Sequence, residues 1–412
     1  MIHTENFKSG LIGEKLGHSF SPQIHSYLAD YEYRLYEMPE SQVGDFVRNS
    51  DLNAFNVTIP YKKTVMPFLD YISPEATRIG SVNTVVRKDG KIYGYNTDYF
   101  GIMYTVRRSG VDIAGKKVLI LGSGGASVTA NTAMRDLGAG EVVVISRKGE
   151  NNYDNISKHA DADIIINTTP VGMYPNNGVS PVDLSGFPNL KWAFDMIFNP
   201  KRTKFLYQAE QLGVKVENGL PMLVAQAKKA CEFFLDTKID DSRIDYIEER
   251  IAVNSQNVVL VGMPGCGKTT VGRRVAELLG RQFIDLDEEI EKFAGTTIPE
   301  IFEKQGESGF RVIEQQVVSE IGKKSWLVIS TGGGVVTRGE NYYPLHQNGQ
   351  IIFLQRDIDQ LCCDGRPLSQ KGRLEEMYKR RYPLYMNFSD AVAQGTNDGE
   401  TTARNILKAA KL

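Results

Sequence analysis

The chain has 412 residues, and its 48 Lys and Arg nearly balance its 50 Asp and Glu, which gives a formal net charge of -2 at pH 7. This length favours two to three domains, and the balanced charge gives no reason to expect a nucleic-acid partner. The polar N-terminal stretch is unlike a signal peptide, and no apolar run is long enough to span a membrane. Its 4 cysteines show no zinc-binding spacing, so we expect a cytoplasmic protein with reduced thiols.

The first segment with a functional signal follows a short strand that is expected over residues 10–13. Ser19 and Ser21 flank Phe20 just ahead of Pro22, and a proline at this point suits the first turn of a helix. The two hydroxyls either cap that helix or bind the oxygens of a polar substrate, and both interpretations stay open from the local sequence.

A further strand is predicted over residues 54–60, where apolar and polar side chains alternate. It contains Thr58 and leads directly into Lys62. Judged by its neighbours alone, a lysine at a strand end is most often a solvated surface residue.

A β-hairpin is predicted next, with strands over residues 80–87 and 91–98 on either side of an Asp-Gly turn. The hairpin presents Asn83 and Asp98 as polar side chains near its strand ends. Residues 101–109 then have the pattern of a helix.

A glycine-rich turn follows the apolar strand that is expected near residues 115–121. A helix over residues 128–137 and a second strand over residues 141–146 come after it. This order of strand, glycine turn, helix and strand predicts a dinucleotide-binding turn of the Rossmann type. The turn residues are Gly122, Gly124, Gly125 and Ala126.

The end of that second strand indicates which dinucleotide is bound. An acid there holds the ribose hydroxyls of NAD, whereas a cation suits the 2′-phosphate of NADP. The chain has Ser146, Arg147 and Lys148 at this point and no acid, so we predict NADP(H). The alternative interpretation is a pair of surface cations without a ligand.

Three more strands are expected over residues 162–167, 192–195 and 214–216, and a helix then extends to Leu235. Strands that alternate with helices predict a parallel sheet whose carboxyl-end loops hold the ligand.

From Gly10 to about Lys238 the chain resembles shikimate dehydrogenase. The resemblance is carried by ordered motifs, namely HSFSPQIH, NVTIPYK, the strand around Asn83, YNTD, GSGGAS, NTTPVGM and GLPMLVAQA. It implies that Lys62 and Asp98 form the catalytic pair. It also implies a set of residues that hold the carboxylate and hydroxyls of the substrate: Ser19, Ser21, Thr58, Asn83, Asp98 and Gln226.

The sequence departs from this family at three positions. Members usually carry Tyr where this chain has Phe198, so one substrate hydrogen bond is expected to be lost or replaced. Val128 stands where an Arg often follows the glycine turn, and Lys148 stands where a small hydroxyl residue often follows the Arg.

Residues 239–254 are charged, with sparse apolar positions and little Gly or Ser. This composition argues against a flexible tether, and we expect a short helix that links two domains.

A second nucleotide-binding signature begins at Asn257. A short apolar strand turns into glycines and ends on Lys-Thr, which matches the G-x-x-x-x-G-K-[ST] loop that wraps nucleotide phosphates. The alternative interpretation, a plain turn, is disfavoured by the strand before it and the helix after it. The residues predicted to bind ATP are Gly262, Gly265, Gly267, Lys268, Thr269 and Thr270.

Two carboxylates end the next strand, which covers residues 281–287. Asp285 and Asp287 are two residues apart, so they lie on the same face of an extended chain. In a kinase, one such acid serves Mg²⁺ and the other accepts the proton of the attacking hydroxyl. The same acids can also start a helix, and the two roles are compatible.

From about Asn257 onward the chain resembles shikimate kinase. The motifs GMPGCGKTT, FIDLDEEIE, IPEIFEKQGESGFRVIE, STGGGVV, GRPL and RYPLY occur in the order of that family. The resemblance implies that Lys268 and Thr269 serve ATP and Mg²⁺ with the help of Asp285, and that Arg366 belongs to a lid over the phosphates. It further implies that Asp287 acts on the reacting hydroxyl. The implied shikimate-binding residues are Asp287, Arg311, Gly333 and Arg381.

The two resemblances predict an α/β protein with three domains and a linker. Residues 1–104, completed by a helix at about 220–238, form an α/β substrate domain, and residues 105–219 form a Rossmann NADP-binding domain. Residues 239–254 are the linker, and residues 255–412 form a P-loop domain of the NMP-kinase-like α/β/α type with a parallel sheet.

The predicted function is a bifunctional enzyme, because the product of the first site is the substrate of the second. It reduces 3-dehydroshikimate to shikimate with NADPH and phosphorylates shikimate with ATP and Mg²⁺, as a monomer or homodimer. The alternative is a quinate/shikimate dehydrogenase with a regulatory, non-catalytic nucleotide-binding domain.

Overall fold

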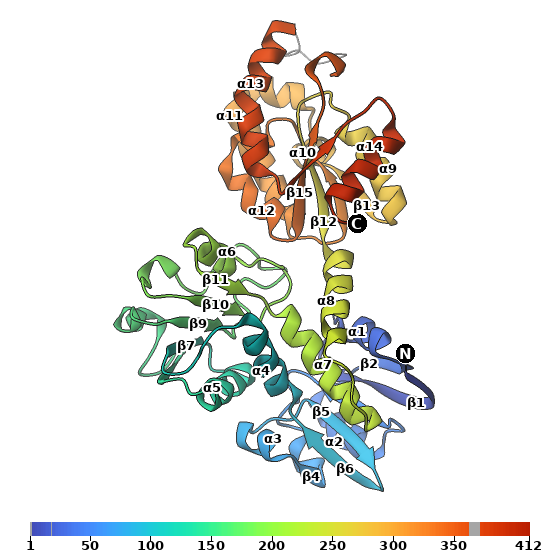
Figure 1. Ribbon diagram of the computed structural model, residues 1–412, viewed down its shortest axis with the longest axis vertical. Coiled ribbons are helices and arrows are strands. Elements are labelled where there is room, and N and C mark those ends of the chain that lie inside the picture. The colour runs from blue at the N-terminus through green and yellow to red at the C-terminus, as the bar shows by residue number, and fades with distance from the viewer. Residues whose placement is uncertain (1, 18, 362–370) are drawn as a thin grey trace. The chain divides into compact units, whose positions relative to one another are not determined.

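The computed structural model describes residues 2–17, 19–361 and 371–412, and its contacts divide the chain into two compact units. The first unit comprises Met1–Gly172, Val179–Phe198 and Phe205–Ile251. The second unit comprises Met173–Gly178, Asn199–Lys204 and Ala252–Leu412. Figure 1 labels the elements of both units. In the described residues no helix is long and apolar enough to cross a membrane.

The N-terminal part of the first unit contains a mixed sheet with the strand order β2-β1-β3-β5-β6-β4. β1 is parallel to both β2 and β3, whereas β5 is antiparallel to both β3 and β6. β5 and β6 therefore form the predicted hairpin. The strands are β1 (Ile2–Gly13), β2 (Ala29–Glu37), β3 (Ala54–Val57), β4 (Tyr71–Ile72), β5 (Thr84–Lys88) and β6 (Lys91–Tyr95).

One face of this sheet is covered by helix α2, whose Val43 and Val47 are fully buried one turn apart. They pack in one core cluster with Ile12 of β1 and Phe55 of β3. The helical elements of this part are α1 (Ser21–Leu28), α2 (Glu40–Asn49), the 3₁₀ turn η1 (Met66–Phe68) and α3 (Pro74–Ile79).

The second sheet of this unit is parallel throughout, with the order β11-β10-β9-β7-β8. Its side chains alternate between two cores: Leu119 and Ile165 enter one cluster, whereas Ile120 and Ile166 enter the other. The parallel sheet that the sequence predicted is thus present. The strands are β7 (Lys117–Leu121), β8 (Glu141–Ile145), β9 (Ile164–Asn167), β10 (Trp192–Asp195) and β11 (Lys215–Glu217).

Helix α4 (Thr97–Ser109) connects the two sheets of the first unit, and helix α7 (Leu220–Leu235) packs along it and back onto the mixed sheet. Ala230 and Phe234 of α7 share a core cluster with Ala54 of β3 and Val86 of β5. The remaining helices are α5 (Gly125–Asp136) and α6 (Lys204–Gln211), with the 3₁₀ segments η2 (Tyr153–His159) and η3 (Leu184–Gly186).

Helix α8 (Ser242–Ser255) lies where the sequence predicted a linker helix. Its guanidinium at Arg243 donates a hydrogen bond of 3.0 Å from Nε to the Tyr27 carbonyl, and its Glu248 pairs with Arg108 of α4. Ile244 and Ile247 are fully buried. Most of this helix therefore packs as part of the first unit.

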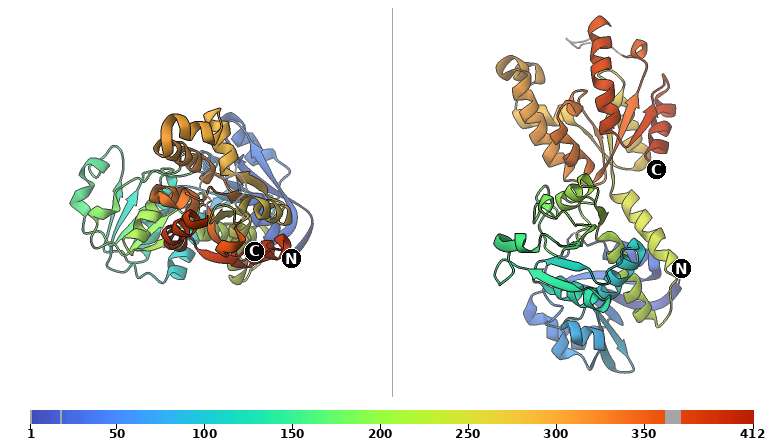
Figure 2. Two further views of the ribbon diagram at one scale, coloured as in Figure 1. Left: turned by 90° about the horizontal axis from the view of Figure 1, so that it is seen from above. Right: turned by 60° about the vertical axis from the view of Figure 1, so that its left-hand side comes forward.

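The second unit is a parallel sheet with the order β13-β14-β12-β15-β16, covered by helices on both faces. Helices α9 and α14 lie on one face and α11, α12 and α13 on the other, as Figures 1 and 2 show. The strands are β12 (Asn257–Val261), β13 (Gln282–Asp285), β14 (Leu327–Ser330), β15 (Gly349–Gln355) and β16 (Ala391–Gln394). The helices are α9 (Lys268–Leu279), α10 (Leu286–Ala294), α11 (Ile298–Gly322), α12 (Tyr342–His346), α13 (Lys371–Phe388) and α14 (Gly399–Ala409), and the 3₁₀ turns are η4 (Val335–Thr337), η5 (Gly339–Asn341) and η6 (Ile358–Gln360).

Candidate active sites

Lys62 and Asp98 form an ion pair in the first unit. The Lys62 Nζ atom lies 2.6 Å from Asp98 Oδ2, and the two side chains are 25% and 14% exposed. Lys62 follows β3, and Asp98 lies in the first turn of α4, which Asn96 caps by accepting a hydrogen bond from the Tyr99 amide. Both ends of the pair are thus held by fixed backbone and remain in reach of a small ligand.

Asn83 and Gln226 are joined by a hydrogen bond of 3.2 Å from the Asn83 amide to Gln226 Oε1. The Asn83 carbonyl oxygen Oδ1 accepts a hydrogen bond of 2.7 Å from the backbone N–H of Thr97. Because this contact assigns the Asn83 oxygen, it also fixes which way the amide nitrogen points. Asn56 supports the arrangement by donating to the Asn83 backbone carbonyl at 3.2 Å.

Ser19, Ser21 and Thr58 lie in segments that follow neighbouring parallel strands. The Ser21 amide donates a 3.2 Å hydrogen bond to Ser19 Oγ, but the N-cap residue of α1 is Phe20 and no side chain caps this helix. The Thr58 amide donates to the Ile12 carbonyl at 3.0 Å, which holds the ends of β1 and β3 together.

These side chains converge on one edge of the mixed sheet for a topological reason. β1 and β3 are parallel and end together, with Ile12 opposite Val57. β5 is antiparallel to β3 and therefore begins at the edge where β3 ends, and β6 returns to that same edge. The segments around residues 19, 58, 62, 83 and 98 consequently border the same edge.

Phe198, where the resembled family usually has Tyr, packs against Phe20 of the first motif. The ring centroids are 5.3 Å apart and the rings meet edge to face. This contact supplies apolar packing at a position where a tyrosine would offer a hydroxyl.

The glycine turn of the parallel sheet leads from β7 into α5. Gly122 has a φ of +105°, and a β-carbon there would lie 2.8 Å from Thr169 Cγ2. A β-carbon at Gly124 or Gly125 would meet no neighbouring side chain or backbone within 4 Å, so open space lies over the N-terminus of α5. The connections after β7 and β9 leave in opposite directions, which places this turn at the switch point where dinucleotides bind.

The end of β8 exposes Arg147 and Lys148 to solvent. Ser146 turns its hydroxyl to the Lys148 carbonyl, at 2.7 Å. Ala126 is the second residue of α5, half-buried beside the glycine turn. The two cations are therefore available to a phosphate that approaches the end of β8.

The second glycine loop, in the second unit, connects β12 to α9. Gly262, Gly265 and Gly267 have φ angles of +153°, +81° and +95°, which an L side chain rarely adopts. Lys268 is only 7% exposed and folds back, donating from Nζ to the carbonyls of Gly262 and Met263, both at 2.9 Å.

Thr269 Oγ1 donates a 2.7 Å hydrogen bond to Asp285 Oδ2. Asp285 ends β13 and caps α10, because its Oδ1 accepts from the Asp287 amide at 3.0 Å. Thr270 is exposed in the first turn of α9. The hydroxyl and the carboxylate thus lie together beside the glycine loop, as oxygen ligands of a hard cation would.

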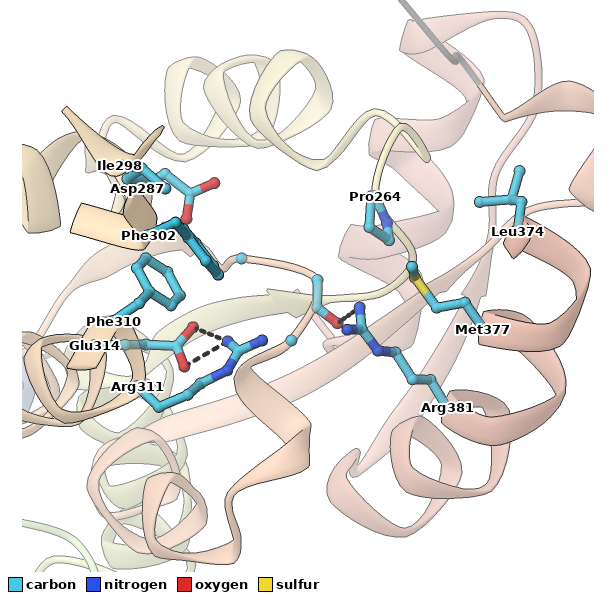
Figure 3. Close-up of a pocket in the computed structure, with 13 residues that line it drawn as sticks. Pro264, Asp287, Ile298, Phe302, Phe310, Arg311, Glu314, Leu374, Met377 and Arg381 are labelled. Atoms are coloured by element: carbon cyan, nitrogen blue, oxygen red, sulfur yellow. Dashed lines mark hydrogen bonds and ion pairs between the residues drawn. The ribbon is translucent and has the colours of Figure 1, made fainter. Parts of the chain in front are cut away.

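A cavity of about 230 Å³ lies next to this loop, and Figure 3 shows the residues that line it. Asp287, Arg311 and Arg381 supply charged groups, and the three glycines from Gly332 to Gly334 form part of the wall. A β-carbon at Gly332 would lie 2.9 Å from Asp287 Oδ1, so the wall touches the acid. Arg381 donates from Nη1 to the Gly333 carbonyl at 3.0 Å.

Arg311 is held by Glu314, one turn later on α11. The Arg311 Nη1 atom donates to the two Glu314 oxygens at 3.0 and 2.8 Å, and both side chains are buried. Burial raises the pKa of Glu314 above its usual value, and the nearby Asp287 carboxylate raises it further. The Arg311 guanidinium acts in the opposite direction and lowers this pKa.

Several residues of this cavity receive no role from the sequence alone. Glu314 is one of them, although an acid three residues after an arginine on a helix is the spacing of an ion pair. The apolar wall carries no local signal, because its members come from different elements; it includes Phe302, Phe310, Leu374 and Met377. Arg366 lies outside the described residues.

Comparison with known proteins finds two families along the chain. A family model of the shikimate dehydrogenase substrate binding domain matches residues 11–85, and a shikimate kinase model matches residues 264–411. The shikimate dehydrogenase (NADP(+)) of Clostridium perfringens (strain SM101 / Type A) is 40% identical over 263 residues, which are 59% of this chain and 97% of that protein.

Solved structures align with the same part of the chain. Shikimate dehydrogenase 1 from Peptoclostridium difficile is 40% identical with a TM-score of 0.56, covering 61% of this chain and 98% of that one. Shikimate 5-dehydrogenase from Thermus thermophilus, in complex with NADP(H) and shikimate, is 29% identical with a TM-score of 0.53, covering 61% of this chain and 99% of that one. Both resemblances predicted from the sequence are confirmed. The chain belongs to the shikimate dehydrogenase family and also carries a shikimate kinase domain, which together imply a bifunctional enzyme of the shikimate pathway.

Proposed function

We propose that the first unit reduces 3-dehydroshikimate to shikimate with NADPH and that the second phosphorylates shikimate with ATP and Mg²⁺. The observation that carries the proposal is that one chain holds the Lys62–Asp98 pair on a polar sheet edge and a cavity with Arg311, Arg381 and Asp287 beside a phosphate-binding loop. The first arrangement suits a ketone, and the second suits a carboxylated alcohol.

In the dehydrogenase site, the chain supplies orientation and a proton. The amide of Asn83, the carboxamide of Gln226 and the hydroxyls of Ser19, Ser21 and Thr58 hold the carboxylate and hydroxyls of the substrate. Lys62 Nζ donates to the carbonyl oxygen and stabilises the negative charge that develops there. Asp98, at 2.6 Å, keeps the ammonium in place and accepts from the neighbouring hydroxyl.

The dinucleotide site fits NADP(H) on the chemistry of its own residues. The open space over Gly124 and Gly125 accommodates a pyrophosphate at the N-terminus of α5, and Gly122 and Ala126 complete the turn. The residues that follow β8 are Ser146, Arg147 and Lys148. They supply a hydroxyl and two positive charges and include no acid, which suits the 2′-phosphate. When bound, NADPH supplies the hydride that reduces the carbonyl.

In the kinase site, Arg311 and Arg381 bind the carboxylate of shikimate, and Gly333 shapes the wall. Asp287 accepts the proton of the hydroxyl that attacks the γ-phosphate of ATP. Lys268 leaves its carbonyl contacts to bind phosphate oxygens, together with the amides of the loop from Gly262 to Thr270. Thr269 and Asp285 would hold Mg²⁺, and Arg366 would belong to the lid.

The proposal also includes the organisation of the chain. Residues 1–104 with the helix at about 220–238 form the substrate domain, residues 105–219 bind NADP(H), residues 239–254 link the halves, and residues 255–412 form the kinase domain. We further propose that the enzyme is cytoplasmic and that it is a monomer or homodimer. Sedimentation of the purified chain would measure its oligomeric state.

The test uses the full chain with 3-dehydroshikimate, NADPH, ATP and Mg²⁺, and separates the products by mass. The wild type is expected to form shikimate 3-phosphate, whereas Asp287→Asn is expected to stop at shikimate. Lys62→Ala is expected to leave 3-dehydroshikimate unreduced while it still phosphorylates added shikimate. Release of ADP at the full rate when both 3-dehydroshikimate and shikimate are left out, or full product from either variant, would contradict the proposal.

A further inference from the structure

The first unit contains a second cavity, of about 320 Å³, which is lined by helices α4 and α7 together with residues of α3 and β6. Its lining includes Tyr99, Met103 and Arg107 of α4 together with Lys229 and Phe233 of α7. Spacings of four residues place each of these sets on one face of its helix. Figure 1 shows the two helices side by side, with α3 and β6 near them. None of the residues assigned above to substrate, cofactor or ATP lines this cavity.

The walls of the cavity are aromatic, and the rings are fixed by contacts with one another. Tyr95 of β6 stacks on Phe233 with ring centroids 4.0 Å apart and an interplanar angle of 11°. The Lys229 ammonium lies 4.9 Å from the centre of the Phe233 ring and 5.4 Å from that of Phe100. The stacked pair therefore forms one aromatic wall, and a planar ligand can lie against its exposed faces and edges.

The charged side chains that line the cavity favour an anionic ligand. Arg107 is exposed and makes no ion pair with any residue that the structure describes. Lys229 adds a second cation and shares one carboxylate, Glu232, with Lys228. Glu75, in the first turn of α3, is the acid in the lining. The cation without a partner is therefore the group that a ligand carboxylate would satisfy.

We propose that this cavity binds a small aromatic carboxylate, with the ring against the aromatic wall and the carboxylate on Arg107 and Lys229. A volume of about 320 Å³ accommodates a single ring with a short acidic side chain. Pockets that combine apolar walls with a few convergent polar groups are typical small-molecule sites.

The cavity shares its two helices with the proposed substrate site. Asn96 lines the cavity, and Asp98 of the next turn contacts Lys62. Gln226 contacts Asn83, and Lys229 follows it by three residues on α7. A ligand here therefore touches the same two helices as shikimate without occupying the same space, so the two are expected to bind together.

The experiment titrates phenylacetate into the full-length protein and measures binding by calorimetry and by saturation-transfer NMR. Two probes serve as controls: phenylacetamide keeps the ring without the charge, and acetate keeps the charge without the ring. We expect saturable binding of phenylacetate at least about tenfold tighter than that of either control. Saturating shikimate is expected to leave this binding in place.

Three variants locate the site. Arg107→Gln is expected to weaken phenylacetate binding about tenfold, and Phe233→Ala is expected to weaken it as well. Arg135→Gln is the matched control, because Arg135 is an exposed arginine in the last turn of α5, as Arg107 is in α4. The circular dichroism of each variant reports whether it is folded, and Arg107→Gln alters an exposed side chain only.

Equal binding of phenylacetamide, loss of binding in saturating shikimate, or unchanged binding in Arg107→Gln would each overturn the proposal. These outcomes are independent of the proposed enzymatic function, because the readout is binding and no turnover is measured. Failure of the dehydrogenase or kinase assays would leave the binding result intact.

Discussion

The backbone of Gly334 runs directly against the guanidinium of Arg311, so that a β-carbon at Gly334 would overlap both terminal nitrogens of the arginine. Arg311 cannot easily move aside, because Glu314 holds it from the other side in a buried pair. The absence of a side chain at Gly334 is therefore a condition for the position of Arg311.

Gly334→Ala is expected to displace Arg311 and raise the KM of the kinase for shikimate by at least about tenfold, the factor that corresponds to about 1.4 kcal/mol. Gly339→Ala is the matched control, since a β-carbon there has no neighbour within 4 Å. Steady-state kinetics with varied shikimate would measure both. An unchanged KM in Gly334→Ala would mean that Arg311 does not bind the substrate.

Lys62→Ala is expected to lower kcat of the dehydrogenase by about 10²- to 10⁴-fold with a much smaller change in KM, because the proposed role of the lysine is to stabilise charge that develops in the transition state. Lys63→Ala is the control, since Lys63 is the exposed neighbouring lysine. Kinase activity of the same preparations reports folding of the second unit. Near-wild-type turnover in Lys62→Ala would refute the catalytic role.

Arg147→Ala is expected to raise the KM for NADPH about tenfold and to leave the KM for NADH unchanged, because only NADPH carries the 2′-phosphate. The ratio of kcat/KM for the two cofactors, measured on one preparation, is an internal control for damage to the fold. If both cofactors lost efficiency equally, Arg147 would support the loop without reading the phosphate.

His25 provides a prediction on the pH dependence of stability. Burial lowers the pKa of His25 to about 3, below the usual 6.5, and the ring is stacked on Tyr33 with centroids 4.0 Å apart. The neutral form is favoured in the folded state, so this contribution to stability is complete above pH 6.5 and declines as the pH falls toward the folded pKa. The expected slope is up to about 1.4 kcal/mol per pH unit.

The measurement is urea unfolding at several pH values between about 7 and about 4.5, which lie on either side of the usual histidine pKa. The difference in stability between the wild type and His25→Phe is the quantity of interest, because the phenyl ring keeps the stacking and removes the titration. This difference is expected to shift toward the variant as the pH falls. A pH-independent difference would show that His25 does not titrate between the folded and unfolded states.

Much of the fold could be predicted from the sequence where local patterns are sufficient. Both glycine turns are read from residue spacing, since positive φ and close approach restrict those positions to glycine whatever the surroundings. The strands of the parallel sheets, such as residues 118–121 and 258–261, are buried on both faces and therefore appear as continuous apolar runs.

Elements stabilised by distant partners could not be predicted in this way. β2 (Ala29–Glu37) lies at the edge of its sheet, and it is absent from the sequence prediction although polar residues at 30, 32 and 34 alternate there with Tyr31, Tyr33 and Leu35. The sequence predicts β1 only over residues 10–13, yet the strand begins at Ile2, because pairing with β2 extends it where the side chains are polar. The extension of β1 is not visible without the partner strand, whereas the alternation in β2 is a local signal.

The residues of the candidate sites also fall into two groups, those that local sequence could predict and those that it could not. Residues inside motifs, such as Lys268 or Asp287, could be named from their neighbours. Glu314 could not be assigned a role, because its importance depends on Arg311 being buried beside Asp287. The apolar wall of that cavity comes from α11 and α13, which are far apart in the sequence, and only packing brings them together.

The hairpin of β5 and β6 has a practical consequence for anyone who wishes to label this protein. Its turn, Asp89-Gly90, has φ angles of 51° and 73° and is exposed, while Asn83 and Asp98 lie at the other end of the same two strands. A fluorophore, an epitope or a short peptide inserted at this turn would lie at the end of the sheet opposite to Asn83 and Asp98. Such a label is expected to leave dehydrogenase activity unchanged.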